Sequence, residues 1–301
     1  MIKNHFIFIF LLSLTTSVFA EGVIFIGDTG RRNASQALVA KAMSAFCKKE
    51  KCQMGILLGD NVYPGGVVSE NDSVLEEAFD FYYNPLKIPF LITMGNHDYG
   101  NKSNIWIRGN YQLAHGKKNP LFYLPSFWYT YETDNTLIAV IDTARMMWRK
   151  DILPQAKMIE EAYALAKSKN KWFIVAGHHP YLSNGHHGNA GSYDGIRSLK
   201  FLSGIYIKNF VEKYICEKAN FYLSGHDHSL QVIDGNIAGC NTQFIISGAG
   251  SAIDSFHGNN KLEFGALKLG FMQLNFASAS AELKVIDENS ETIFEKSYKK
   301  K

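Results

Sequence analysis

The sequence predicts an α/β fold in which parallel strands alternate with helices. Continuous apolar runs of strand length recur along the chain, and such runs are typical of strands buried on both faces. Amphipathic helical patterns separate the first of these runs, which indicates right-handed parallel crossovers. The 301 residues, 46% of them apolar and 20% charged, can bury a large core, and we expect one domain over residues 21–301.

The first twenty residues predict a signal peptide that is cleaved after Ala20. Lys3 lies in a short polar start, the segment 6–14 is apolar, and small residues lead to Ala20. A membrane anchor is the alternative, but this apolar segment is too short to span a bilayer. We therefore expect no membrane anchor and a mature chain that is secreted or periplasmic.

Helices and strands follow one another along the mature chain. Apolar residues at helical spacing predict helices that begin near Asn33 or Ser35 and after Asp72 or Ser73, and further helices over about 155–169 and 204–218. Residues 101–125 mix aromatic and polar side chains, and we expect them to form a loop at the wall of the active cleft. Four hairpin-like strands after Gln243 predict a second sheet.

The four cysteines predict disulfide bonds, because an exported chain passes through an oxidising compartment. All four precede predicted strands, and we expect the pairs Cys47 with Cys52 and Cys216 with Cys240. A zinc site would require paired short spacings such as C-x-x-C, which the sequence lacks.

The charge pattern argues against a nucleic-acid partner. The formal net charge is +3, and acidic and basic residues are mixed throughout the chain rather than gathered into a basic patch. The sequence leaves the oligomeric state undefined.

Polar motifs follow five of the apolar runs directly, where parallel strands would end. They begin at Asp28, Asp60, Asn96, His178 and His226. Each alone is typical of a turn or a polar loop, but the carboxyl ends of parallel strands meet at one edge, so we expect the five motifs to converge. Carboxylates, an amide oxygen and imidazoles together predict a two-metal centre for phosphate ester hydrolysis. Tyr63 adds a phenolate, a hard donor that suits a trivalent ion such as iron.

These motifs resemble those of the calcineurin-like metallophosphoesterase superfamily. The Gly-Asp, Gly-Asn-His, Gly-His and Gly-His-x-His elements occur in the family order. Asp28-Thr29-Gly30, where many relatives carry a histidine two residues after the aspartate, and Tyr63 after Asp60 resemble the small purple acid phosphatases of the tartrate-resistant type. The resemblance implies a four-layer α-β-β-α sandwich of two mixed sheets flanked by helices, the metallophosphoesterase fold.

The resemblance also implies how the metals are held. A ferric site would consist of Asp28, Asp60, Tyr63 and His228, and a divalent site of Asp60, Asn96, His178 and His226, with Asp60 bridging. The cofactor would then be Fe3+ with Fe2+, Zn2+ or Mn2+. The implied reaction is the attack of a metal-bound hydroxide on a phosphate monoester, with an acidic pH optimum.

Three further side chains are implied to contact the substrate. His97 adjoins Asn96 without being a ligand in the family pattern, so it is the expected general acid. His187 matches a second substrate-facing histidine, although its neighbour His186 is an open alternative, and Asn96 would contact the substrate as well.

Four charged residues near these motifs receive other roles. We expect Asp98 and Asp142 to orient ligands or support the structure. Arg31 and Arg32 follow the first motif and would either clamp a phosphate or be solvated, a choice that the sequence leaves open.

The expected substrates are small-molecule phosphate esters, with phosphoproteins or nucleotides as further candidates. A phosphodiesterase or nucleotide hydrolase on the same site is the alternative activity. A catalytically silent metal-binding protein with a role in host interaction is the alternative from another class, and the presence of all seven predicted ligands together with His97 argues against it.

Overall fold

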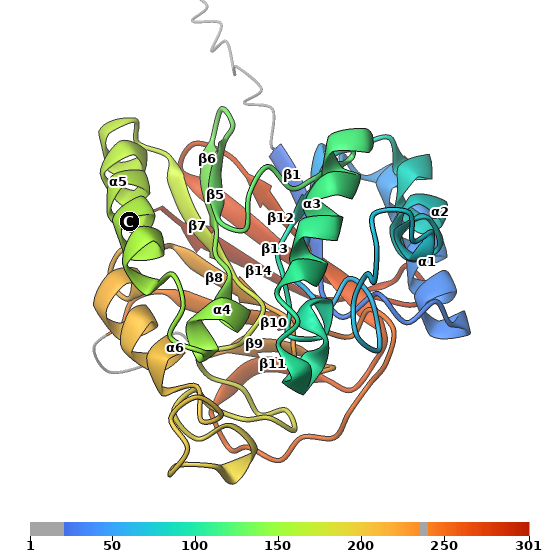
Figure 1. Cartoon of the computed structure of the whole chain (residues 1–301). Helices are drawn as coiled ribbons and strands as arrows, with labels where there is room; N and C mark the ends of the chain where they lie inside the picture. The colour runs from blue at the N-terminus through green and yellow to red at the C-terminus, as the bar shows by residue number, and fades with distance from the viewer. Residues whose placement is uncertain (1–20, 235–239, 301) are drawn as a thin grey trace, which may run out of the picture.

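Two seven-stranded sheets stack face to face, with helices on both outer sides (Figure 1). The computed structural model describes residues 21–234 and 240–300. The predicted signal peptide lies outside the described residues. This arrangement is the predicted four-layer sandwich, and both sheets are mixed, as expected.

The strands have the following bounds: β1 Glu21–Ile26, β2 Met54–Leu57, β3 Phe90–Ile92, β4 Phe122–Tyr123, β5 Tyr129–Glu132, β6 Thr136–Val140, β7 Trp172–Ala176, β8 Phe221–Ser224, β9 Leu230–Ile233, β10 Gln243–Ser247, β11 Leu262–Ala266, β12 Gly270–Phe276, β13 Ser280–Asp287 and β14 Thr292–Lys299. The α-helices are α1 Ala34–Lys49, α2 Phe81–Tyr83, α3 Ile107–Lys118, α4 Thr143–Met147, α5 Ile152–Ser168 and α6 Ile205–Phe210. Two π-helical segments, η1 Glu76–Asp80 and η6 Val211–Ile215, adjoin α2 and α6, and four 3-10 turns are η2 Asn84–Leu86, η3 His97–Tyr99, η4 Asn101–Ser103 and η5 Tyr193–Gly195.

The first sheet combines the two ends of the described chain, in the order β14-β13-β12-β1-β2-β3-β4. The second sheet has the order β11-β9-β10-β8-β7-β6-β5. A second sheet is present, but of the four strands predicted for it after Gln243 only β10 belongs to it, and the assignment of the other three was wrong. β10 pairs with β8 in the second sheet, whereas β12 pairs antiparallel with β1 and extends the first sheet through β13 and β14.

The core between the sheets is built from strand side chains of both. The rings of Trp172, Phe221 and Phe276 lie within 6.0 Å of one another and join β7 and β8 to β12. A second apolar cluster lies between the second sheet and the helices α5 and α6. On the other side of the molecule, α1 and η1 bury Phe46 and Phe79 against the first sheet. Both faces of the sheets are therefore covered by packed side chains.

The predicted helices lie at the predicted positions in the chain, but two of them differ in helix type. Asn33 is the N-cap of α1, since its side chain accepts a hydrogen bond from the Gln36 amide. The helix expected after Asp72 or Ser73 is a π-turn followed by α2 and a 3-10 turn, and the helix expected over 204–218 becomes π-helical at Val211. The expected loop over 101–125 instead contains the 12-residue helix α3. Its amphipathic pattern is weak because Gly109 and Gln112 occupy buried positions.

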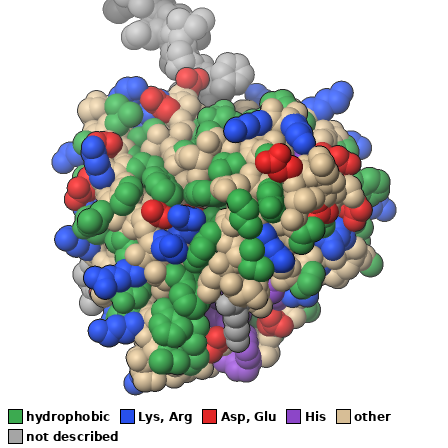
Figure 2. Space-filling view, in the orientation of Figure 1, with side chains coloured by type: hydrophobic (Ala, Val, Ile, Leu, Met, Phe, Trp, Pro, Cys, Tyr) green, Lys and Arg blue, Asp and Glu red, His purple; other side chains and the backbone are tan. Residues whose placement is uncertain are grey.

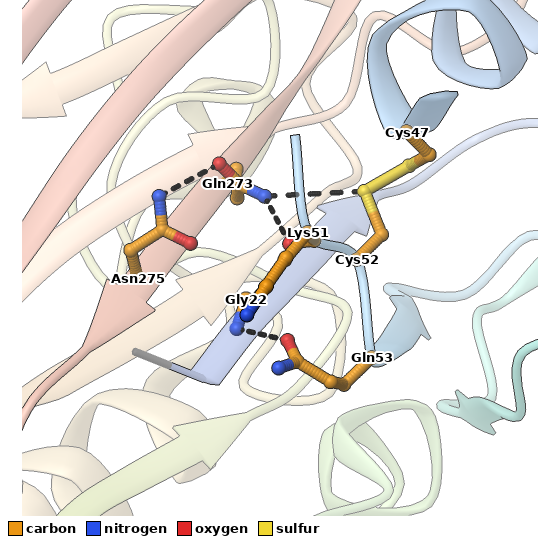
Figure 3. The surroundings of a disulfide bond; sticks show 7 residues. All are labelled: Gly22, Cys47, Lys51, Cys52, Gln53, Gln273 and Asn275. Atoms are coloured by element: carbon orange, nitrogen blue, oxygen red, sulfur yellow. Dashed lines mark hydrogen bonds between the residues drawn. A yellow bond between two sulfur atoms is a disulfide. The ribbon is translucent and has the colours of Figure 1, made fainter. Parts of the chain in front are cut away.

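Both expected disulfide bonds are present, Cys47 with Cys52 and Cys216 with Cys240. The first connects the end of α1 to the segment that enters β2 (Figure 3). Beside it, the Gln273 side chain donates to the Lys51 carbonyl, so this short loop is also tied to β12. Both bonds lie near strand beginnings, at the end of the sheets opposite to the polar motifs.

Within residues 21–234 and 240–300, no helix has the length and apolar character needed to cross a membrane.

Candidate metal centre

The five polar motifs converge where the carboxyl ends of β1, β2, β3, β7 and β8 meet. These strands run parallel within their own sheets, so their ends share one edge. Backbone hydrogen bonds connect the motifs across this edge. The Asp28 amide donates to the Gly59 carbonyl at 3.0 Å, the Gly225 amide donates to the His178 carbonyl at 3.0 Å, and the Gly27 amide donates to Ser247 of β10 at 2.6 Å.

The glycines that precede the polar residues make room for carboxylates. A Cβ atom on Gly95 would lie 2.2 Å from Asp60 Oδ1, and one on Gly225 would lie 2.6 Å from Asp28 Oδ2. Neither distance is compatible with van der Waals contact. The Gly-x pattern of the motifs therefore reflects close packing of one motif's backbone on another motif's side chain.

Three of the polar residues have backbone conformations that non-glycine residues rarely adopt. The φ angles are 60° at Asp28, 55° at Asp60 and 70° at His226. Such conformations persist where the surrounding structure enforces them, and they cluster at functional sites. Here the hydrogen bonds between the motifs enforce them and turn the side chains toward one another.

One cluster of donor atoms consists of Asp28, Tyr63 and His228. The Tyr63 hydroxyl donates to Asp28 Oδ1 at 2.9 Å and lies 3.3 Å from His228 Nε2. His228 Nε2 is 3.6 Å from Asp28 Oδ1, and Nδ1 on the other side of the ring faces Asp254 Oδ2 at 2.8 Å. Burial and the negative charges of Asp28 and Asp60 raise the pKa of Tyr63 well above its ordinary value.

A second cluster consists of Asn96, His178 and His226. His178 Nε2 lies 3.1 Å from Asn96 Oδ1 and 3.2 Å from His226 Nδ1. The opposite nitrogen, His178 Nδ1, is 2.8 Å from the Leu58 carbonyl, a contact that requires a proton on Nδ1. In the neutral ring, Nε2 therefore presents a lone pair to the cluster.

Asp60 lies between the two clusters, since its ligand atom is within 4.8 Å of those of Asp28 in the first and His178 in the second. Its Oδ2 lies 3.5 Å from His178 Nε2, and its Oδ1 accepts a hydrogen bond from the His97 amide at 2.8 Å. Burial alone would raise the pKa of Asp60, but the attraction of His178 and His97 outweighs burial and lowers it. Conversely, burial alone would lower the pKa of His178, but the negative charge of Asp60 outweighs burial and raises the pKa of His178 to about 10. The space between Asp60 and His178 thus favours a positive charge.

This donor set fits metal cations. The ligand atoms of Asp28, Asp60 and His178 lie within 4.8 Å of one another, and so do those of His178, His179 and His226. Carboxylates that are wholly buried with few basic partners are stabilised by bound cations. A cation between Asn96 Oδ1, His178 Nε2 and His226 Nδ1 would occupy the point where three potential lone pairs meet.

His97 and His187 lie at the rim of the site. His97 Nδ1 is 2.6 Å from the Pro64 carbonyl, which fixes the ring so that Nε2 faces Asp60 Oδ2 at 4.0 Å. The His187 ring stacks on His226 with centroids 4.0 Å apart, and Asp194 Oδ1 lies 2.7 Å from its Nδ1. His186 is exposed, and its ring faces His187 and His257 rather than His226.

The cavity at this edge has a volume of about 760 Å³ and is lined by both rim histidines. Its lining also includes His186 and five of the seven predicted ligands, namely Asp60, Tyr63, Asn96, His226 and His228. Asp28 and His178 lie deeper and are fully buried.

Sequence reasoning missed several residues of the site. His179 adjoins the second cluster, with a ring nitrogen within 4.8 Å of the ligand atoms of His178 and His226, but its Nδ1 faces the Thr143 hydroxyl at 2.8 Å. Asp194 and Asp254, which pair with His187 and His228, lie in no recognisable motif, and His257 also lines the cavity. The fold brings Asp194, Asp254 and His257 to the site, and the sequence carries no signal that identifies these three residues.

The four charged residues with open or supporting roles have distinct environments. The Arg31 guanidinium lies 4.4 Å from the Tyr63 ring centroid, whereas Arg32 pairs with Glu77 at 3.7 Å, away from the donor clusters. Asp142 accepts a hydrogen bond from Tyr99 at 2.5 Å and caps α4 through the Arg145 amide. Burial raises the pKa of Asp142 to about 7.

Asp98 holds two of the motifs in place. Its wholly buried carboxylate accepts hydrogen bonds from the Gly95, Asn61 and Val62 amides at 2.8, 2.9 and 3.1 Å, and from Gln112 of α3 at 2.8 Å. Burial and the neighbouring Asp60 raise the pKa of Asp98 to about 7. Asp98 thereby fixes the loops that carry Asp60 and Asn96 relative to each other.

Comparison with known proteins identifies relatives along most of the chain. Residues 22–230 match the calcineurin-like phosphoesterase family. Purple acid phosphatase 3 of Arabidopsis thaliana is 30% identical over 87% of this chain and 73% of its own length. Tartrate-resistant acid phosphatase type 5 of Sus scrofa is 27% identical over 86% of this chain and 76% of its own length.

Solved structures share the fold at lower identity. GAP50, described as the anchor in the inner membrane complex of Plasmodium, superimposes with a TM-score of 0.70 over 94% of this chain and 90% of that chain, at 22% identity. A dimetal phosphatase from Danio rerio gives a TM-score of 0.51 at 12% identity, over 94% of this chain and 99% of that chain.

Replacing Asp98 with alanine is expected to destabilise the fold strongly. Asp98→Ala removes the acceptor of five buried donors, which should lower the free energy of unfolding by at least about 3 kcal/mol in urea denaturation. Asp72→Ala is the matched control, because Asp72 also accepts two backbone amides, those of Val68 and Val74, but near the surface. Water can replace that acceptor, so we expect a loss below about 1 kcal/mol. Equal losses for both variants would contradict the role of Asp98.

Proposed function

Because this chain belongs to the calcineurin-like phosphoesterase family, we propose that it is an exported acid phosphatase that hydrolyses phosphate monoesters with two metal ions. The observation that supports this most directly is the convergence of two donor clusters that share Asp60 at one edge of the sheets. The similarity to purple acid phosphatases along most of the chain supports the monoester activity.

We assign the ligands by cluster. Asp28, Tyr63 and His228 would hold one ion, Asn96, His178 and His226 the other, and Asp60 would bridge the two. The closest contacts support this division, since Tyr63 lies beside Asp28 and His228, and His178 lies beside Asn96 and His226. A phenolate among the ligands favours Fe3+ in the first position, and Fe2+, Zn2+ or Mn2+ would suit the second.

When bound, the two ions would neutralise the charge of the phosphate ester and activate a water molecule for attack on phosphorus. The protein's own residues would then orient the substrate and donate a proton to the leaving group. Asn96 and His187 line the cavity next to the second cluster, where they can orient the phosphoryl oxygens. Because a trivalent ion activates water below neutral pH, we expect an acidic optimum.

His97 is placed to protonate the leaving oxygen. Its Nδ1 is held by the Pro64 carbonyl, which leaves Nε2 as the nitrogen that faces the cavity, and the side chain is 23% exposed. A protonated ring would donate from Nε2 to the departing alkoxide, while Nδ1 keeps its hydrogen bond. Of the two adjacent histidines in the 183–194 segment, we assign the substrate contact to His187, because its ring stacks on His226.

We also infer that the protein is exported. Two disulfide bonds support this, because such bonds persist in oxidising compartments.

The activity is tested by measuring metal content and hydrolysis on one preparation. We expect two metal ions per chain and turnover of para-nitrophenyl phosphate with an acidic optimum, together with slower turnover of the bis-ester. Removal of the metal ions by a chelator should abolish the hydrolysis of both esters. Faster hydrolysis of the diester would favour a phosphodiesterase, and two bound ions without turnover at any pH would favour a catalytically silent metal-binding protein.

The iron assignment is tested by colour. If Tyr63 binds Fe3+ as a phenolate, the oxidised iron-loaded protein should absorb visible light, and Tyr63→Phe should remove that band. Tyr99→Phe is a suitable control, because Tyr99 is also buried but its hydroxyl bonds Asp142 outside the donor clusters. A colourless wild-type protein, or an unchanged band in Tyr63→Phe, would rule out the phenolate bond to iron.

Removing the His97 ring should slow the chemical step and leave metal binding intact. We expect His97→Ala to lower kcat by about 10²- to 10⁴-fold toward alkyl phosphates, whose leaving groups need a proton. The loss should be smaller toward para-nitrophenyl phosphate, because nitrophenolate leaves without protonation. His115→Ala, a histidine paired with Asp80 away from the site, serves as the control. Equal losses toward both kinds of ester would argue against proton transfer by His97.

A further inference from the structure

A second, smaller cavity opens beside the candidate metal centre. Its volume is about 120 Å³. It shares Asn96, His187, Asp194 and His226 with the larger cavity, so the two spaces are continuous along these side chains. A group attached to a phosphate at the metal centre can therefore extend into the smaller cavity.

The far wall of this smaller cavity is apolar and largely aromatic. It consists of Trp106 ahead of α3, Met147 and Trp148 at the end of α4, and Phe201 and Leu202 ahead of α6. The rings of Trp148 and Phe201 lie 5.0 Å apart and are inclined by 31°. We name this set of five side chains the apolar wall.

Neighbouring contacts hold the apolar wall in place. The Trp106 ring packs on the buried Tyr99 with centroids 5.0 Å apart, and the Arg145 guanidinium lies 5.3 Å from its centroid. Arg145 is in turn fixed by Asp151 at 2.6 Å. The Trp106 side of the cavity is thus built by packed and ion-paired groups.

The cavity has little charge to offer a polar ligand. Among its described lining residues, the one carboxylate is Asp194, which is paired with His187 at 2.7 Å, and no lysine or arginine is present. A second phosphate would lose hydration there without gaining a lysine or arginine as partner. An apolar group, in contrast, gains free energy by leaving water.

We propose that the apolar wall is a leaving-group subsite, and that Trp148 and Phe201 make the protein select phosphate monoesters whose alcohol carries a flat, uncharged ring. This inference rests on the proposed function, because it places the phosphate at the two donor clusters. The size agrees, since an apolar cavity of roughly 150 Å³ accommodates benzene. The cavity of about 120 Å³ therefore admits one six-membered ring. The cavity adjoins the metal centre through the lining residues that it shares with the larger cavity.

The surface supports an open entrance to this subsite. Phe201 is 38% exposed, although a large apolar side chain is ordinarily buried. Figure 2 shows histidine side chains gathered at the lower edge of one face of the molecule, with a group of apolar side chains beside them. A ring that enters the subsite would cover part of the exposed Phe201 surface.

The subsite is tested by comparing benzyl phosphate with ethyl phosphate. Both release a primary alkoxide, so they differ mainly in the ring. We expect kcat/KM to be about tenfold higher for benzyl phosphate, the gain that burial of a ring provides. Trp148→Ala and Phe201→Ala should each reduce this ratio to about two or three. Leu199→Ala is the matched control, because Leu199 is an apolar side chain of the same segment, 47% exposed and outside the cavity lining. It should keep the full ratio.

A binding measurement separates this proposal from the proposed function. The metal-loaded protein is titrated calorimetrically with benzylphosphonate and ethylphosphonate, which cannot be hydrolysed. We expect benzylphosphonate to bind about tenfold more tightly, and Trp148→Ala to remove most of that difference. If neither ester is hydrolysed but this difference persists, the subsite stands and the phosphatase activity fails. Equal affinities for the two phosphonates, or a preference that survives both Trp148→Ala and Phe201→Ala, would overturn the subsite.

Discussion

The constraint on which the rest of this structure depends is the burial of two carboxylates, Asp28 and Asp60, at the edge where the two sheets meet. Buried carboxylates require hydrogen-bond donors and nearby positive charge. The backbone supplies donors from two neighbouring motifs, the His226 amide to Asp28 and the His97 amide to Asp60. Asp60 also raises the pKa of His178, so this buried carboxylate favours a positive charge beside it. A metal ion would meet the same need.

Much of this centre could be predicted from the sequence, because its side chains lie in short motifs close to the strands that position them. The motifs that carry the metal-ligand candidates begin within a few residues of a strand end, so identifying the strands places these motifs at one edge. The pairing of Cys47 with Cys52 was equally accessible, since their separation of five residues leaves few alternatives. The resemblance to purple acid phosphatases added what local patterns lack, namely which side chains belong to the same cluster. The roles that it implies for these residues remain proposals.

What the sequence did not show depends on contacts between distant segments. β12 has the alternating pattern of a hairpin strand, but that pattern does not show which strand it pairs with. In the structure it pairs with β1 in the first sheet, where Phe276 lies opposite Glu21 at the far end of the chain. The α3 helix was missed because Gln112 is buried for its hydrogen bond to Asp98, which weakens the amphipathic pattern. Asp194 and Asp254 reach their histidines from loops whose sequences carry no motif.

The site has two parts with different structural support, the donor clusters at the strand ends and the apolar wall beside them. Asp98 and the glycine contacts tie the donor clusters to the ends of central strands, where a small shift would break several hydrogen bonds at once. The apolar wall comes instead from segments outside the sheets, before α3, after α4 and before α6. Substitutions there change the shape of the smaller cavity without disturbing the strand ends. Selectivity for the alcohol can therefore vary independently of the metal centre, which is the physical reason why membership of a family of phosphoesterases leaves the substrate to be determined chain by chain.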